Sequence, residues 1–196
     1  MRVAVLVSGG GTNLQALLDA KAAGKLPDAE FCVVVASKPG VYALERAARA
    51  GVPTAVVRKK DYPDAGAFNA AMLRTLQSYG AEAVVLAGYL SIVGENVIAA
   101  YPDKILNIHP SLIPAFCGAG YYGLKVHEAA LARGVKVTGA TVHLVNEEYD
   151  AGRIVLQKAV EVQPGDTPET LQKRVMEQAE WLLLPEAVAL LTGGRL

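Results

Sequence analysis

Ile105-Leu106-Asn107-Ile108-His109-Pro110-Ser111-Leu112-Ile113-Pro114 is the stretch that decides which fold and which chemistry to expect of this chain. It opens with apolar residues, as a buried strand does, and stops at Pro110, which cannot donate to a sheet ladder. Side chains two residues apart on a strand project to the same face, so Asn107 and His109 should lie side by side. An amide donor beside an imidazole can stabilise an oxyanion and move a proton. These residues alone leave a structural alternative open, in which Asn107 caps a turn and His109 is a hydrogen-bonded core histidine.

Apolar runs and helical spacings alternate through the first half of the chain. The expected strands are 3–7, 31–36, 53–57, 83–87 and the strand that carries Asn107 and His109. Helices are expected from residue 14 and over 42–50, 64–78 and 92–99. This alternation predicts a doubly wound, mainly parallel open α/β sheet with helices on both faces. We expect residues 1–196 to form a single domain.

The second half predicts an antiparallel edge and a long helix. Residues 115–126 show no periodicity and are expected to form a loop, followed by a short helix over 127–133. Strands are expected over 138–145 and 154–162, and the tight turn between them predicts antiparallel pairing. Thr167 is a candidate N-cap, with Pro168 at the first position of an amphipathic helix that runs towards Leu191.

Candidate site residues gather at the carboxyl edge of this predicted sheet, where open α/β sheets bind ligands. The first strand ends in Ser8-Gly9-Gly10-Gly11-Thr12-Asn13, and a helix follows. Such a turn presents free backbone N–H groups to an anion. It matches neither a Walker loop nor a full G-x-G-x-x-G pattern, because position 14 is leucine. Phosphate binding and a plain tight turn both stay open.

The composition restricts the function classes. Lys plus Arg and Asp plus Glu number 19 each, which argues against a nucleic-acid binder. Two cysteines provide neither a disulfide framework nor a metal cluster. There is no apolar stretch of transmembrane length and the start does not look like a signal peptide, so we expect a cytoplasmic protein with no membrane partner.

Two motifs resemble those of a known family, the folate-dependent formyltransferases. Residues 106–114 resemble the family signature, and residues 138–143 with 150–154 resemble its second motif. Residues 8–15 are similar to the opening of members that act on glycinamide ribonucleotide. The resemblance covers essentially the whole chain. It implies formyl transfer from the co-substrate 10-formyltetrahydrofolate to the amine of glycinamide ribonucleotide, in purine biosynthesis and without a metal.

The resemblance also implies roles for particular residues. The catalytic trio falls on Asn107, His109 and Asp150: Asn107 as oxyanion donor, His109 as general acid, and Asp150 raising the pKa of His109. Implied substrate contacts are Gly11, Thr12 and Asn13 for the phosphate and Glu180 for the amine, although another alignment would put Ala179 there. The implied folate-binding residues are Leu90, Ser91, Ile92, Val93, Asn107, Asn146, Glu147, Glu148, Tyr149 and Asp150. His143 would support the site structurally rather than transfer a proton.

Three departures from the family concern binding and the loop. Ser91 stands where many relatives have arginine. Ala65 stands where a basic residue usually meets the glutamate tail of the folate, and only Lys59 and Lys60 lie nearby in sequence. The loop over 117–126 is longer than in some relatives and resembles a bacterial variant that carries lysine in place of Ala119.

Alternative functions stay in view. A formyltetrahydrofolate deformylase would use the same trio to deliver the formyl group to water, usually with an added amino-terminal domain. A methionyl-tRNA formyltransferase would need a tRNA-binding domain and a basic surface. A non-catalytic nucleotide-binding module is possible because a fold alone does not determine function. The expected partners are the two small-molecule substrates, and the protein is a possible homodimer.

Overall fold

The computed structural model describes residues 1–196 and contains one seven-stranded sheet in the order β3-β2-β1-β4-β5-β6-β7. Strands β1 to β5 run parallel, and β6 and β7 pair antiparallel at one edge. Their bounds are Arg2–Val7, Glu30–Ala36, Thr54–Val56, Ala83–Leu86, Ile105–His109, Val137–Leu144 and Ile154–Glu161. The predicted fold class and antiparallel edge are therefore confirmed.

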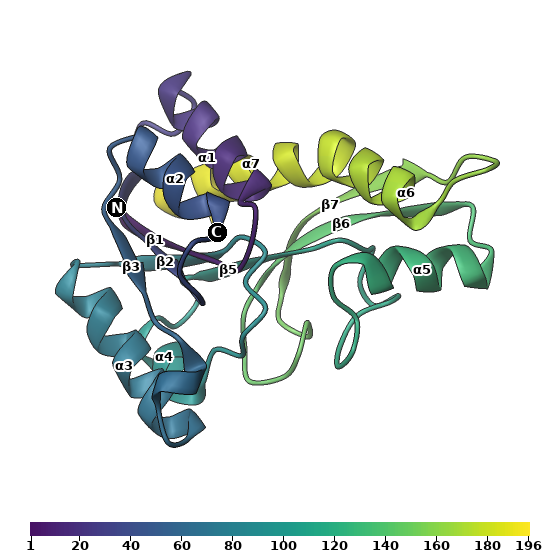
Figure 1. Ribbon diagram of the computed structural model, residues 1–196. Coiled ribbons are helices and arrows are strands. Elements are labelled where there is room, and N and C mark those ends of the chain that lie inside the picture. Colours follow the sequence, from purple (N-terminus) through teal and green to yellow (C-terminus); the bar gives the residue numbers. More distant parts are fainter.

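Helices cover both faces of the parallel part (Figure 1). Their bounds are α1 Thr12–Ala22, α2 Tyr42–Arg49, α3 Ala65–Ser78, α4 Glu95–Ala100, α5 Leu124–Arg133, α6 Pro168–Val175 and α7 Trp181–Thr192. A short 3₁₀ turn, η1, spans Lys59–Asp61, and a π-helical segment, η2, spans Met176–Glu180. One core cluster joins β1 to α1, α2, α6 and α7, and a second joins it to α3 and α4.

The strands show the burial that their sequences predict. Residues 3–7 of β1 are almost fully buried on both faces, which suits a parallel strand between two helical layers. Strand β7 at the edge exposes most of its side chains. The parallel centre is thus the most apolar part of the sheet, and polar groups are concentrated at strand ends and in the loops that follow.

Two predicted boundaries of helices were wrong. Helix α4 begins at Glu95 rather than at residue 92, because the Gly94 N–H donates to Asn69 Oδ1 (2.8 Å) and ties the preceding residues to α3. Helix α5 begins at Leu124, so the predicted loop is shorter than expected. Val126, in the first turn of α5, is fully buried.

The expected long carboxy-terminal helix is divided by the π-helical segment η2. Thr167 caps α6 as predicted, through a reciprocal capping box with Thr170. Pro185 lies inside α7 and has no N–H to donate to the carbonyl of Trp181, the residue that follows η2. Single π turns of this kind often lie at functional sites.

The turn between β6 and β7 packs tightly against the end of β6. A Cβ atom on Gly152 would lie 1.7 Å from the Leu144 carbonyl oxygen, so only glycine fits there. This close approach folds the turn back towards the end of β5. It thereby determines where Asp150, two residues earlier, is placed.

Candidate active site

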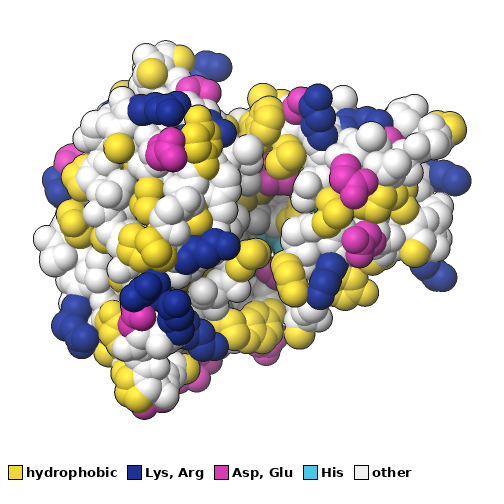
Figure 2. Space-filling model, in the orientation of Figure 1, with side chains coloured by type: hydrophobic (Ala, Val, Ile, Leu, Met, Phe, Trp, Pro, Cys, Tyr) yellow, Lys and Arg dark blue, Asp and Glu magenta, His cyan; other side chains and the backbone are white.

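A large cavity opens along the carboxyl edge of the sheet, and its volume is about 1580 Å³. Its walls come from the turns after β1, β4 and β5, from residues 118–123, from the β6–β7 turn and from η2. Figure 2 shows the corresponding hollow between two parts of the molecule, with a histidine visible inside. Every site residue predicted from the sequence lines this cavity.

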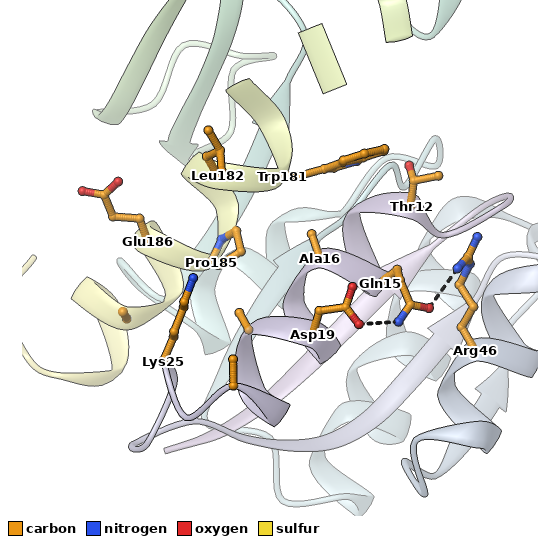
Figure 3. Close-up of a pocket in the computed structure, with 13 residues that line it drawn as sticks. Thr12, Gln15, Ala16, Asp19, Lys25, Arg46, Trp181, Leu182, Pro185 and Glu186 are labelled. Carbon is orange, nitrogen blue, oxygen red and sulfur yellow. Dashed lines mark hydrogen bonds between the residues drawn. The ribbon is translucent and has the colours of Figure 1, made fainter. Parts of the chain in front are cut away.

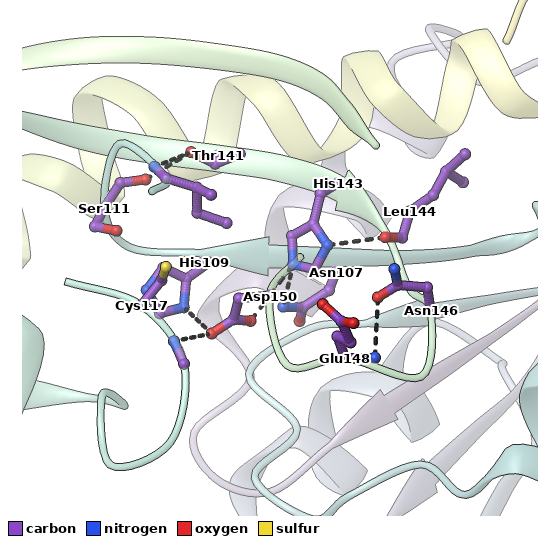
Figure 4. A network of polar contacts seen from close by, with 12 residues as sticks. Asn107, His109, Ser111, Cys117, Thr141, His143, Leu144, Asn146, Glu148 and Asp150 are labelled. Atoms are coloured by element: carbon purple, nitrogen blue, oxygen red, sulfur yellow. Dashed lines mark hydrogen bonds and ion pairs between the residues drawn. The ribbon is translucent and has the colours of Figure 1, made fainter. Parts of the chain in front are cut away.

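The catalytic trio expected from the sequence meets around Asp150 (Figure 4). His109 Nδ1 lies 3.6 Å from Asp150 Oδ2, and His143 Nε2 lies 3.5 Å from Asp150 Oδ1. Asn107 and His143 are direct neighbours across β5 and β6, with Asn107 Nδ2 3.0 Å from His143 Nε2. The structure therefore brings together residues that are more than forty positions apart in the chain.

The hydrogen bonds assign a tautomer to His143. Its Nδ1 lies 2.9 Å from the Leu144 carbonyl oxygen, which only accepts, so Nδ1 carries the proton. In the neutral ring Nε2 then accepts from the Asn107 amide. This bond orients Asn107, whose second amide hydrogen stays free for another acceptor. A supporting role for His143 agrees with this geometry.

His109 is buried, with 5% of its surface exposed, and Nε2 donates to the Phe116 carbonyl at 2.9 Å. Burial is the largest influence and lowers the pKa of His109, with a further lowering from His143. The Phe116 carbonyl and the Asp150 carboxylate act in the opposite direction but do not prevail. Asp150 thus raises the pKa of His109 as expected from the sequence, but burial outweighs this effect.

Asp150 stays ionised despite being largely enclosed. Burial opposes ionisation, but the His143 ring, the Gly118 N–H and the positive charge of His109 together lower the pKa of the Asp150 carboxyl. The Gly118 N–H donates to Oδ2 at 2.9 Å. The loop after β5 thus contacts both ionisable groups: the Phe116 carbonyl contacts His109, and the Gly118 amide contacts Asp150. No side-chain pattern in the sequence marks these two backbone contacts.

The glycine turn after β1 has the geometry of an anion site. Gly11 precedes α1 with a φ of 73°, and a Cβ there would lie 2.6 Å from Ala43 Cβ. Only glycine meets both demands, so the turn can place the N–H groups of Thr12 and Asn13 at the cavity. Asn13 Oδ1 is buried and has no hydrogen-bond partner in the chain.

A second cavity, of about 580 Å³, lies behind this turn between α1 and α7 (Figure 3). Arg46 Nε donates to the Gly10 carbonyl at 2.8 Å, and Arg46 Nη1 donates to Gln15 Oε1 at 2.8 Å. Gln15 in turn donates to Asp19. These bonds hold the glycine turn from the side away from the large cavity. Sequence reasoning missed Arg46, which lies on α2 and carries no motif.

Glu180 lies on η2 and is 6% exposed. Its Oε2 accepts from Asn13 Nδ2 at 2.7 Å, which joins η2 to the start of α1. Burial raises the pKa of Glu180 to about 7, although the Asn13 hydrogen bond opposes the rise. The side chain therefore lies beside the glycine turn and can change its charge near neutral pH.

We expect Glu180→Gln to stabilise the protein above neutral pH. Between the ordinary glutamate pKa of 4.5 and about 7, the folded chain holds a proton that the unfolded chain has released. The contribution of Glu180 to the free energy of unfolding therefore falls as pH rises through that interval, by up to about 3 kcal/mol. Glutamine can keep the Asn13 contact and does not ionise. Urea unfolding at pH 5 and pH 8 tests this, and equal stability differences at both pH values would contradict it.

The remaining predicted residues form the outer walls. Three apolar side chains of these walls are more than half exposed, those of Leu90, Ile92 and Tyr149. Exposed apolar surface of this kind is typical of a ligand-binding groove. No group of three or more His, Cys, Asp or Glu side chains is arranged to hold a metal ion. None of the helices has the length and apolar character needed to cross a membrane.

Comparisons with known proteins agree on one family. A family model described as formyl transferase matches residues 1–188. The chain is 45% identical to the trifunctional purine biosynthetic protein adenosine-3 of Gallus gallus over 99% of its own length but only 19% of that protein. It is 41% identical to a chloroplastic phosphoribosylglycinamide formyltransferase of Arabidopsis thaliana, covering all of this chain and 66% of the relative.

Solved structures show the same likeness. Glycinamide ribonucleotide transformylase 1 from Symbiobacterium toebii superposes with a TM-score of 0.93 at 46% identity, covering 100% of this chain and 89% of that one. Phosphoribosylglycinamide formyltransferase from Bacillus halodurans gives a TM-score of 0.89 at 38% identity, covering 96% and 94%.

Proposed function

The chain belongs to the formyl transferase family, and on that premise we propose that it transfers the formyl group of 10-formyltetrahydrofolate to the amine of glycinamide ribonucleotide. One observation carries the proposal. Asn107, His109 and Asp150 face the same cavity as the glycine turn and Glu180. A formyl donor and a phosphorylated amine can therefore be held together in one site. The names of the plant relative and of the Symbiobacterium toebii structure refer to the same reaction.

The glycine turn would hold the ribonucleotide. Backbone N–H groups at Gly11, Thr12 and Asn13 suit its phosphate, because the start of α1 favours negative charge. Glu180 would accept a hydrogen bond from the glycinamide amine. The folate would lie along Leu90, Ser91, Ile92 and Val93 and against the turn formed by Asn146, Glu147, Glu148, Tyr149 and Asp150.

The chemical step needs an oxyanion donor and a proton carrier. The amine nitrogen attacks the formyl carbon, and the free amide hydrogen of Asn107 would stabilise the resulting oxyanion. The amine then loses a proton, and the folate nitrogen gains one as its bond to carbon breaks. Burial keeps the His109 ring neutral at rest, so it can accept a proton and then donate it. Asp150 would stabilise the imidazolium formed in between.

The first test is absorbance-followed deformylation of 10-formyltetrahydrofolate with and without glycinamide ribonucleotide. We expect turnover that depends on the ribonucleotide. Ribonucleotide-independent turnover would favour the deformylase alternative. No turnover from folded protein would favour a non-catalytic binding module. We propose that residues 1–196 act as a single catalytic domain, and a cytoplasmic location and a homodimer stay predictions.

A further inference from the structure

The walls of the large cavity hold no lysine or arginine that could compensate a phosphate group. None of the residues that line it carries either side chain. Five carboxyl groups line it instead, those of Glu95, Glu147, Glu148, Asp150 and Glu180. A phosphate at the glycine turn therefore depends on backbone N–H groups and on positive charge that lies behind the cavity wall.

Arg46 is the basic side chain that contacts the glycine turn. It lies on α2, and its Nε donates to the Gly10 carbonyl at 2.8 Å. Its Nη1 donates to Gln15 Oε1 at 2.8 Å, and Gln15 donates in turn to Asp19 (Figure 3). The guanidinium also lies 4.7 Å from the centre of the Tyr42 ring. Arg46 is therefore fixed in place, and it forms no ion pair that would neutralise its charge.

The bond from Arg46 determines where the next backbone N–H points. The peptide unit between Gly10 and Gly11 is trans, so its carbonyl and its N–H point in opposite directions. The Gly10 carbonyl points to Arg46, away from the large cavity, and the Gly11 N–H therefore points to the cavity side. This N–H has no hydrogen-bond partner in the chain. The Gly9 carbonyl accepts from the Ala43 N–H of α2 (3.3 Å), so the N–H that follows it is turned to the same side.

The guanidinium also makes the Gly11 N–H a stronger donor. A cation bonded to a carbonyl polarises the whole peptide unit, and hydrogen bonds that follow one another in a chain reinforce each other away from bulk water. The peptide unit between Gly10 and Gly11 therefore connects the charge of Arg46 to an anion bound at the turn. Arginine suits this place because its planar fork makes both bonds at once, whereas lysine carries a single point charge.

We propose that Arg46 is the positioning residue for the phosphate of the amine substrate, and that it provides the positive charge that the cavity walls lack. The inference rests on the proposed function. Arg46 acts through the Gly10 carbonyl and does not touch the substrate. Selection of a phosphorylated amine over an unphosphorylated one should therefore depend on Arg46. The folate walls and the groups around Asp150 should not, because they come from other turns of the same sheet edge.

The test compares glycinamide ribonucleotide with glycinamide riboside, the same amine without its phosphate. In the unmodified enzyme kcat/KM should be higher for the ribonucleotide. We expect Arg46→Gln to reduce the ratio of the two kcat/KM values about tenfold, through a higher KM for the ribonucleotide and with little change in the KM for 10-formyltetrahydrofolate. A general disturbance of the fold would lower both kcat/KM values to the same degree and leave their ratio unchanged.

Arg49→Gln is the matched control. Arg49 lies on the same helix, 5.5 Å from the centre of the same Tyr42 ring, but it pairs with Glu45 and does not contact the glycine turn. This variant should leave the ratio unchanged. If Arg46→Gln does not fold, Arg46→Lys provides the same comparison. Its expected loss is smaller, because lysine keeps the charge but cannot make both bonds of the fork.

Calorimetric titration with glycinamide ribonucleotide in the absence of folate provides a measurement that needs no turnover. Its Kd should rise about tenfold in Arg46→Gln. An unchanged Kd in the folded variant would overturn the proposal, as would an equal loss of kcat/KM for ribonucleotide and riboside. Binding that depends on Arg46 but is followed by no formyl transfer would support the role of Arg46 and overturn the proposed function instead.

Discussion

His109→Ala lowers kcat by about 10²–10⁴ if the imidazole carries the proton between the attacking amine and the folate nitrogen. Neither Asn107 nor Asp150 can replace it: the amide does not titrate, and although burial opposes ionisation of Asp150, contacts with His143 and Gly118 lower the pKa of its carboxyl, so it is a weak base at neutral pH. The KM values should change less than kcat, since the glycine turn and the apolar wall remain. Steady-state kinetics measure both.

The control for this substitution addresses folding. His109 is buried and donates to the Phe116 carbonyl, so alanine removes packing and a hydrogen bond together. His109→Gln retains much of the volume and an N–H donor but cannot carry a proton at neutral pH. Both variants should lose activity to a similar degree while their circular dichroism stays unchanged. Near-normal turnover in the folded glutamine variant would exclude His109 as the proton carrier.

Asp150→Asn should reduce kcat by at least about 10² because the imidazolium of His109 loses its counter-charge. Asparagine is the suitable replacement: Asp150 has a φ of 53°, and asparagine tolerates this left-handed conformation better than most residues. Its amide oxygen can still accept from Gly118. The loop contact and the turn are therefore retained while the negative charge is removed.

The pKa of His109 provides an independent measurement for this variant. Asp150 raises that pKa against the larger effect of burial, so removing its charge should lower the pKa further. Nuclear magnetic resonance titration of the histidine ring measures the shift. A drop in kcat with no shift would mean that Asp150 acts on the substrate rather than through His109. Full activity in the variant would contradict any catalytic role.

Much of the site was predictable from the chain alone because its residues follow strand ends. Parallel strands end at one edge, so the turn at Gly11, the stretch at Ser91 and the pair on β5 had to be neighbours. Asp150 and Glu180 could be placed only through resemblance to a family. Their approach depends on the tight turn at Gly152 and on the π-helical segment, which no local pattern in the sequence predicts.

The sequence by itself determined the buried parallel strands, the helix cap at Thr167 and the amide and imidazole on one face of β5, because each depends on residues close together in the chain. Only the tertiary structure decided the charge state of the site. The pKa of His109 reflects burial by distant segments, and that burial outweighs the nearby carboxylate. Burial likewise raises the pKa of Glu180. Desolvation depends on everything that surrounds a group, which is why a sequence motif does not reveal it.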